Sequence, residues 1–289
     1  MSRLMFTAIL AALLHLSAQA QAEAAPIKIV AAENFYGDLA QQIGGNAVSV
    51  TSILSNPNQD PHEFEASPDT ARALANAAIV IYNGVDYDPW MEKLLSASKG
   101  TNRTAIVAGD LTGHKSGDNP HLWYDLPTMP KVAEALAAEL KRRDPADAAT
   151  FDTRLKAFEA SMTGIHNAVD KLRAAHKGME VTATEPVFGY MADAIGFAMR
   201  NQHFQIAVMN DTDPSPQDVA AFQDDLKSAR VKILFYNNQV TDDLTKHMLD
   251  LAHQSHVAVV GVSETEPPGK SYQQWMSGQL AEISKAVGH

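Results

Sequence analysis

The chain has 289 residues, of which 45% are hydrophobic and 20% are charged, and its formal net charge is -11. This length allows two lobes of ordinary domain size, each with a core of its own. The acidic balance and the lack of any long basic run argue against a nucleic acid or an anionic membrane surface as the main partner.

The N-terminus has the pattern of an export signal. A short positive region precedes an apolar run over residues 5–16, which is too short to span a bilayer, and small residues follow it. We expect a signal peptide over residues 1–22, cleaved after Ala22, with Ala20 and Ala24 as alternative sites. The protein is therefore expected to be exported to the periplasm.

The sequence contains no cysteine. An exported chain of this kind has no disulfide and relies on its core for stability. Thiolate metal sites and cysteine catalysis are excluded as well. Because bacterial lipoproteins are attached through a cysteine, we also expect no membrane anchor.

We interpret residues 23–128 as an N-terminal α/β lobe, because short apolar runs alternate with helical patterns. Strands are predicted over 27–32, 48–54, 78–82 and 104–108, and helices over 35–43, from Pro68 after the N-cap Ser67, and over 89–98. Alternation of this kind indicates βαβ units and a parallel sheet.

Residues 129–178 contain helical patterns and no strand signal. Helices are predicted over 130–143 and over 145–176. In the second, seven apolar residues from Phe151 to Leu172 recur at gaps of three and four, the mark of an amphipathic helix. A helix of roughly 30 residues would be about 45 Å long and could act as a spine between two lobes.

The alternation resumes over residues 179–289, which we interpret as a C-terminal α/β lobe. Strands are predicted over 180–183, 232–236 and 257–262, and helices over 188–195, from Pro216 after Ser215, over 242–254 and over 272–286. The predicted fold class is thus α/β, with two parallel-sheet lobes joined by one long spine helix.

Two loops present a histidine in the same way. His62 follows Pro61, His121 follows Pro120, and each histidine is followed two positions later by an aromatic residue. A proline fixes its own φ and favours an extended conformation before it, so it presents the imidazole from a stiff loop. Neutral imidazole is the commonest protein ligand for transition metals. We interpret His62 and His121 as two corners of a metal site.

Two carboxylates occupy matching positions in the second lobe. Ligands of open α/β sheets bind beyond the carboxyl ends of the strands. Glu185 and Glu264 each follow a predicted strand there, and Glu266 is a neighbour that the pattern does not exclude as the fourth ligand. Two imidazoles and two carboxylates would balance one divalent cation and fill a tetrahedral shell. The predicted metal ligands are therefore His62, His121, Glu185 and Glu264.

We also predict which residues near these ligands accept hydrogen bonds from the imidazoles. Metal-bound imidazoles usually donate their other N–H to an acceptor, and Glu63, Glu65 and Asp125 are the acceptors we consider. His114 lies in a short polar loop and is expected to be exposed to solvent.

Four segments together resemble the solute-binding proteins of bacterial ABC transporters for zinc and manganese. They are DPHEFE at 60–65, NPHLW at 119–123, EPVFGY at 185–190 and ETEPPGKSY at 264–272. The resemblance extends over the whole chain after the signal peptide, in the right order. It implies two lobes that clamp one cation, a stiff helix that limits their closure, and a monomer that delivers the metal to a permease in the inner membrane.

The sequence departs from the zinc-type pattern of that family. The pattern usually has a histidine where Glu185 stands and often a histidine-rich loop before the second Pro-His, whereas here only His114 lies in that loop. The manganese-type pattern, with two histidines and two carboxylates, is closer, although its last acid is typically an aspartate. Carboxylates suit manganese, but zinc binds more tightly to almost any such site. We expect one Mn²⁺ or Zn²⁺ ion.

Two other functions are compatible with export and a metal site. An exported metallohydrolase would leave a coordination position open for water, but the sequence has no His-Glu-x-x-His helix and no Gly-x-Ser-x-Gly motif. A binding protein for a metal chelate would need an aromatic-lined or arginine-lined cleft. We expect that the protein is not an enzyme.

Overall fold

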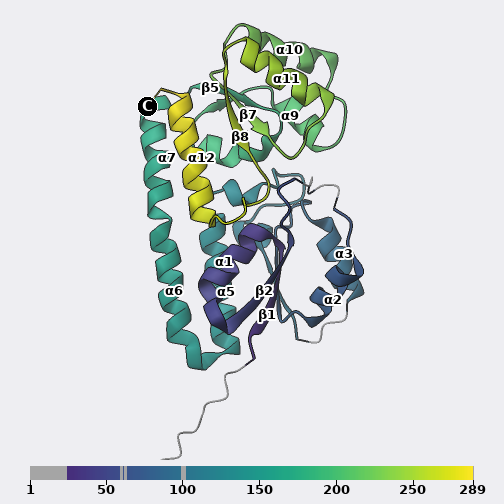
Figure 1. Cartoon of the computed structure of the whole chain (residues 1–289), viewed down its shortest axis with the longest axis vertical. Coiled ribbons are helices and arrows are strands. Elements are labelled where there is room, and N and C mark those ends of the chain that lie inside the picture. Colours follow the sequence, from purple (N-terminus) through teal and green to yellow (C-terminus); the bar gives the residue numbers. More distant parts are fainter. Residues whose placement is uncertain (1–24, 59–60, 62–63, 99–101, 289) are drawn as a thin grey trace, which may run out of the picture.

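The computed structural model describes residues 25–58, 61, 64–98 and 102–288. The predicted signal peptide, the first Pro-His histidine His62 and the predicted acceptor Glu63 lie outside the described residues. Two lobes are stacked along the long axis of the molecule, and a rod of two helices runs along one side of both (Figure 1).

The first lobe is built on a four-stranded parallel sheet with the order β2-β1-β3-β4. Its strands are β1 (Ile27–Glu33), β2 (Val48–Leu54), β3 (Ile79–Tyr82) and β4 (Thr104–Val107). Its helices are α1 (Asn34–Gly44), α2 (Pro68–Asn76), α3 (Pro89–Ala97), α4 (Ala108–Thr112) and α5 (Thr128–Arg143), with a 3-10 turn η1 (Gly45–Ala47).

The second lobe repeats this topology, with the four-stranded order β6-β5-β7-β8, again all parallel. Its strands are β5 (Glu180–Ala183), β6 (Ala198–Met199), β7 (Ile233–Asn237) and β8 (Ala258–Val262). Its helices are α8 (Gly189–Ile195), α9 (Gln202–Met209), α10 (Pro216–Lys227), α11 (Asp243–Gln254) and α12 (Tyr272–Ala286). The α/β class with two parallel-sheet lobes is confirmed.

The predicted spine helix is present as two helices in line, α6 (Ala148–Ser161) and α7 (Thr163–His176), which follow the 3-10 turn η4 (Pro145–Asp147) (Figure 1). Met162 lies between them with φ -72° and ψ -16°, so the chain hardly changes direction. The hydroxyl of Ser161 donates to the carbonyl oxygen of Phe158, a side-chain bond that competes with the helical hydrogen bonds at this point. Residues 161–164 also include Thr and Gly, which are weak helix formers.

One hydrophobic core extends through both lobes. Strand residues such as Ile29 and Phe235 belong to it, and so do the buried faces of α1, α5, α7 and α12. The ring centroid of Tyr124, from the first lobe, lies 5.1 Å from that of Phe188 and 5.7 Å from that of Trp275 in the second. Each sheet has a smaller core on its other face, under α2 and α3 in one lobe and under α9, α10 and α11 in the other.

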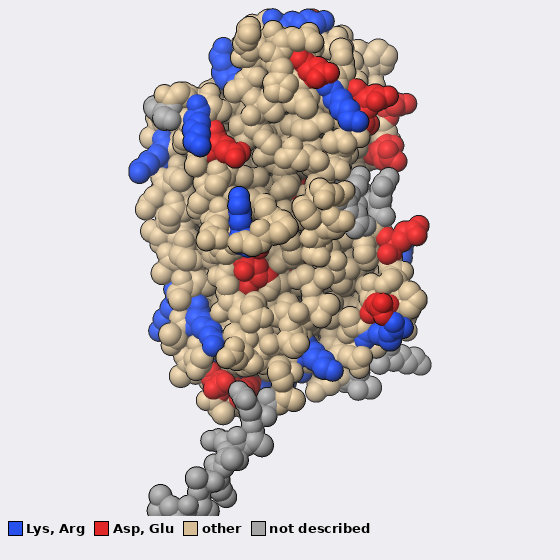
Figure 2. Space-filling view, in the orientation of Figure 1, with Lys and Arg blue, Asp and Glu red and all other residues tan. Residues whose placement is uncertain are grey.

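Most predicted elements are confirmed to within a few residues. The structure adds β6, α4 and α9, which we had not predicted. The division into residues 23–128, 129–178 and 179–289 stays a prediction. None of the helices in the described part of the chain combines the length and apolar character that crossing a bilayer requires. On the face shown in Figure 2, positive and negative side chains are interspersed over both lobes.

Candidate metal centre

His121 is held in one orientation by its own loop, which leads into the 3-10 helix η3 (Leu122–Tyr124). Oδ1 of Asn119 accepts from the backbone N–H of His121 at 3.1 Å and lies 2.6 Å from its Nδ1. Because an amide oxygen only accepts, we place the ring proton on Nδ1. Nε2 is then the nitrogen able to bind a metal.

Glu264 faces that nitrogen from the second lobe. Its Oε2 lies 3.5 Å from Nε2 of His121, and both side chains are fully buried. The backbone N–H of Glu264 donates to Oε1 of Gln239 at 2.6 Å, which orders the turn after β8. An imidazole nitrogen and a carboxylate oxygen from different lobes are thus brought together out of contact with water.

Glu185 is connected to Glu264 through Asn237. Glu185 follows β5 and precedes the 3-10 helix η5 (Pro186–Phe188), and its side chain is buried. Asn237 is the last residue of β7, and its Nδ2 donates both to Oε2 of Glu185 and, at 2.7 Å, to Oε1 of Glu264. One amide offsets only part of the repulsion between two buried carboxylates, so the arrangement favours a bound cation.

A second pair of buried acids lies in the first lobe. Glu33 ends β1, and Asp88 accepts from the backbone N–H groups of Asn83 at 2.7 Å and Gly84 at 2.8 Å. Burial, reinforced by the neighbouring Asp88, raises the pKa of Glu33 well above its usual range. Burial also raises the pKa of Asp88 to about 7, although the two N–H donors oppose this. These acids therefore favour the protonated form more than ordinary carboxyls do.

The backbone of Glu266, the other candidate for the fourth ligand, is hydrogen-bonded to the side chain of Asn34. Its backbone N–H donates to Oδ1 of Asn34 at 2.9 Å, and its carbonyl oxygen accepts from Nδ2 of Asn34 at 2.7 Å. Burial and the nearby Asp38 raise the pKa of the Glu266 carboxyl to about 9. The geometry favours Glu264 over Glu266 as the partner of His121.

Of the four predicted ligands, the structure brings His121 and Glu264 together and links Glu185 to them through Asn237. His62 is outside the described residues. Within the part of the chain that is described, no three His, Asp or Glu side chains converge as a complete metal-binding group. The four-ligand set therefore stays a prediction.

The expected partner of the second imidazole is corrected by the structure. Asn119, rather than Asp125 or Glu65, accepts from Nδ1 of His121. Asp125 instead lies 3.4 Å from Nε2 of His114, and Glu65 is exposed. We expected His114 to be exposed, but it is half-buried, because the centroid of its ring lies 5.1 Å from that of Tyr190. The ring of His114 therefore packs against the second lobe, whereas residues 115–118 of the same loop are exposed.

Neither Asn119 nor Asn237 was predicted from the sequence as part of the site. Asn237 stands at the carboxyl end of a strand, so the rule that selected Glu185 and Glu264 could have found it. Asn119 was visible within the second Pro-His motif, but its role depends on a contact with the other lobe. No local pattern signals such a contact.

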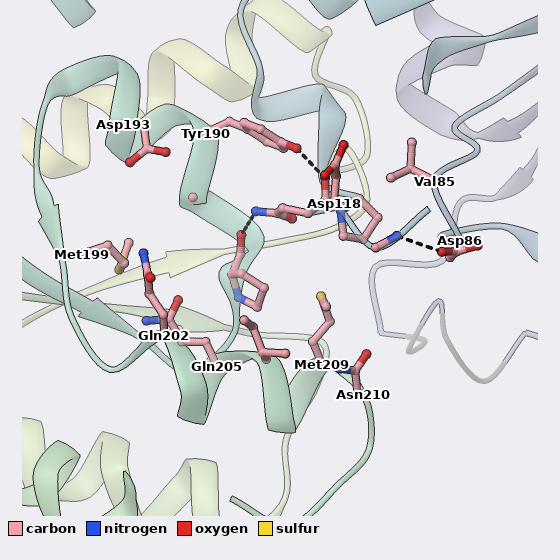
Figure 3. Close-up of a pocket in the computed structure, with 16 residues that line it drawn as sticks. Val85, Asp86, Asp118, Tyr190, Asp193, Met199, Gln202, Gln205, Met209 and Asn210 are labelled. Atoms are coloured by element: carbon pink, nitrogen blue, oxygen red, sulfur yellow. Dashed lines mark hydrogen bonds between the residues drawn. The ribbon is translucent and has the colours of Figure 1, made fainter. Parts of the chain in front are cut away.

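A cavity of about 440 Å³ lies between the lobes beside this centre (Figure 3). Its lining includes Val85, Asp86 and Asp118 from the first lobe and Tyr190, Asp193 and Met209 from the second. The described lining residues include no arginine, lysine or tryptophan. The described lining thus offers an anionic chelate one aromatic ring, that of Tyr190, and no cationic side chain.

Comparison with known proteins gives a consistent result. The model of the family described as zinc-uptake complex component A, periplasmic, matches residues 29–286. The manganese ABC transporter substrate-binding lipoprotein PsaA of Streptococcus pneumoniae serotype 4 and the iron ABC transporter substrate-binding lipoprotein MtsA of Streptococcus pyogenes serotype M1 are each 24% identical over 280 residues. Each match covers 90% of this chain and 89% of the relative.

A solved structure has the same fold. The periplasmic zinc-binding protein TroA of Treponema pallidum superposes with a TM-score of 0.78 at 18% sequence identity. The match covers 92% of this chain and 100% of that protein.

Proposed function

The chain belongs to the family of periplasmic zinc-uptake components, substrate-binding proteins of metal ABC transporters, and from this we propose that it captures one divalent transition-metal cation and delivers it to an ABC-type importer. The observation that carries the proposal is the buried contact between Nε2 of His121 and Oε2 of Glu264, 3.5 Å apart across the two lobes. Neutral imidazole and carboxylate are ligands that such cations prefer.

The proposed ligands are His62, His121, Glu185 and Glu264. Two carboxylates supply the charge that balances a dication, and two imidazoles supply neutral nitrogen donors. The cargo we propose is Mn²⁺ or Zn²⁺. The relatives carry the names of different metals, and the affinity order of divalent metals favours zinc at almost any such site. Affinity alone therefore does not identify the metal that is transported.

We propose that the protein works in the periplasm as a monomer and hands its cargo to a permease in the inner membrane. The family to which it belongs consists of transporter components, and relatives named as substrate-binding lipoproteins support an exported location. Fractionation of cells that express the full chain, followed by immunoblotting, tests the location. Recovery from the cytoplasm alone would contradict it.

The metal site is tested by titration of the purified, chelator-stripped protein with Mn²⁺ and Zn²⁺. We expect one equivalent to bind and the melting temperature to rise, because a ligand that binds only the native state stabilises it. His121→Ala and Glu185→Ala should each lose the rise. His203→Ala is the matched control, since that imidazole is 88% exposed and lies on α9.

Three outcomes would count against the proposal. They are no stoichiometric binding, binding that survives both substitutions, and equal losses in the His203 control. Turnover of a hydrolysable ester or peptide by the metal-loaded protein would instead favour a metallohydrolase. Saturable binding of a metal chelate but not of the free ion would favour a chelate-binding protein.

A further inference from the structure

The side chain of Asn119 contacts both lobes at the proposed metal site. Its Oδ1 accepts from the His121 backbone N–H and lies 2.6 Å from Nδ1 of the same residue. Its Nδ2 donates to the carbonyl oxygen of Pro186 in the second lobe at 2.7 Å. Pro186 directly follows Glu185 in the chain. A single amide thus joins the imidazole of one proposed ligand to the backbone beside another.

The second lobe is shaped to receive this amide. The hydroxyl of Tyr190 donates to the backbone carbonyl oxygen of Asn119 at 2.7 Å, a bond drawn as a dashed line in Figure 3. A Cβ atom added at Gly189 would lie 2.8 Å from Nδ2 of Asn119, closer than real Cβ contacts. Gly189 therefore leaves the space that Asn119 needs. We call Asn119, Pro186, Gly189 and Tyr190 the clasp.

The clasp also stands between two of the proposed ligands, His121 and Glu185, and the cavity. All four clasp residues line the cavity of about 440 Å³ between the lobes. His121 and Glu185 do not line it, and they are 0% and 2% exposed. Side chains that water does not reach interact more strongly with a charge, so the clasp helps to keep the site dry.

Asn34 makes a comparable contact elsewhere and allows a matched comparison. It also connects the lobes by two hydrogen bonds, both to the backbone of Glu266. Its side-chain bonds join it to no imidazole. Removal of Asn34 or Asn119 should therefore weaken the contact between the lobes similarly, whereas of the two only Asn119 bonds directly to a proposed ligand.

We propose that Asn119 is a positioning residue for metal capture. It keeps the proton of His121 on Nδ1, so that Nε2 is presented to the metal, and it sets the place of that imidazole relative to Glu185. This inference rests on the proposed function. An acceptor behind a metal-binding histidine typically contributes roughly 10- to 100-fold in metal affinity, and this acceptor is itself fixed by the opposite lobe.

The test compares Zn²⁺ affinities of Asn119→Ala and Asn34→Ala by competition with a chromophoric chelator. We expect Asn119→Ala to bind roughly 10- to 100-fold more weakly than the wild type and Asn34→Ala to change by less than about threefold. Side-chain ¹⁵N NMR reads the tautomer directly. The Nδ1–H form of His121 should dominate in the wild type and in Asn34→Ala but not in Asn119→Ala.

Asn119→Asp separates the two halves of the proposal and serves if Asn119→Ala does not fold. Aspartate still accepts from Nδ1 but cannot donate to the carbonyl oxygen of Pro186. We expect Asn119→Asp to retain the Nδ1–H tautomer of His121 and to bind Zn²⁺ more weakly than the wild type. Where Asn119→Ala folds, the affinity of Asn119→Asp should lie between those of the wild type and Asn119→Ala.

Equal losses in Asn119→Ala and Asn34→Ala, or wild-type affinity in Asn119→Ala or Asn119→Asp, would overturn the inference. The proposed function fails separately, if the wild type binds no equivalent of metal or if His121→Ala binds as the wild type does.

Discussion

Glu33 and Glu185 occupy related places in the two lobes but have different surroundings. Glu33 is the last residue of β1, and Glu185 lies two residues after the end of β5. Each of these strands comes first in its lobe, and it pairs with β3 in the first lobe and with β7 in the second. Glu185 accepts from the amide of Asn237, whereas Glu33 lies near another acid, Asp88. A donor favours the ionised form, and a neighbouring acid favours the protonated form. This difference favours the second lobe as the source of the carboxylate ligands.

Glu33→Gln should make the metal-free protein less sensitive to pH. Because burial raises the pKa of Glu33, the folded state binds a proton there more tightly than the unfolded chain does. The free energy of unfolding therefore falls as pH rises from about 4.5 to the raised value, by about 1.4 kcal/mol per pH unit at most. Glutamine mimics the protonated acid and removes this fall.

Thermal melts from pH 4 to pH 9 would measure the effect. We expect the melting temperature of Glu33→Gln to exceed that of the wild type by a margin that grows with pH. The exposed Glu282→Gln is the control. A constant difference between Glu33→Gln and the wild type over the whole range would contradict the prediction.

Local rules reach only part of the candidate site. The prediction of His121 came from its proline, and the predictions of Glu185 and Glu264 came from their positions after strands. Asn119 could not be assigned its role, because its acceptor, Pro186, is 67 residues away in the sequence and in the other lobe. The choice of Glu264 over Glu266 likewise depends on which of two nearby carboxylates turns towards His121.

At the scale of single elements, caps made the helix starts predictable. Ser67 and Ser215 each accept from the backbone N–H three residues on, as the Ser-Pro pattern predicts. The short strand β6 was not predictable in this way. It has two residues, which pair with Glu180 and Val181 of β5, and its stability comes from that pairing rather than from its own sequence.

Gly164→Ala should stabilise the rod formed by α6 and α7. Gly164 is exposed in α7, and a Cβ atom there would meet nothing within 4 Å. Alanine reduces the backbone freedom of the unfolded chain, so we expect the free energy of unfolding to rise by about 0.4 to 1 kcal/mol. Urea denaturation measures this change.

Gly178→Ala is the matched control for that substitution. Its Cβ atom would also have open space, but Gly178 has φ of +82°, which alanine adopts only with strain. We expect this variant to lose about 1 kcal/mol or more. Stabilisation of both variants, or of neither, would show that the backbone angle does not decide the effect.

At the scale of the whole molecule, the lobes share one core. Aromatic side chains of the first lobe, such as Tyr124, pack on Phe188 and Trp275 of the second. Lobes with separate cores often unfold separately, whereas a large apolar interface couples them.

Calorimetry of the metal-free protein should therefore give a single transition, with a calorimetric enthalpy equal to the van't Hoff enthalpy. Trp275→Ala should lower its midpoint without splitting it, because the loss of a large buried ring removes about 3 to 5 kcal/mol. Two resolved transitions in the wild-type protein would contradict the shared core.

The aromatic core that crosses between the lobes also affects how the proposed metal ion would be released. A wide opening would expose rings such as Tyr124 and Trp275 to water, at roughly 2 to 3 kcal/mol for each fully hydrated side chain. We therefore expect spontaneous opening to be rare and exchange of a bound ion with the surrounding pool to be slow. Under the proposed function, such a carrier would be a poor buffer for metal ions, and release of each ion to the proposed importer would need work supplied from outside the protein.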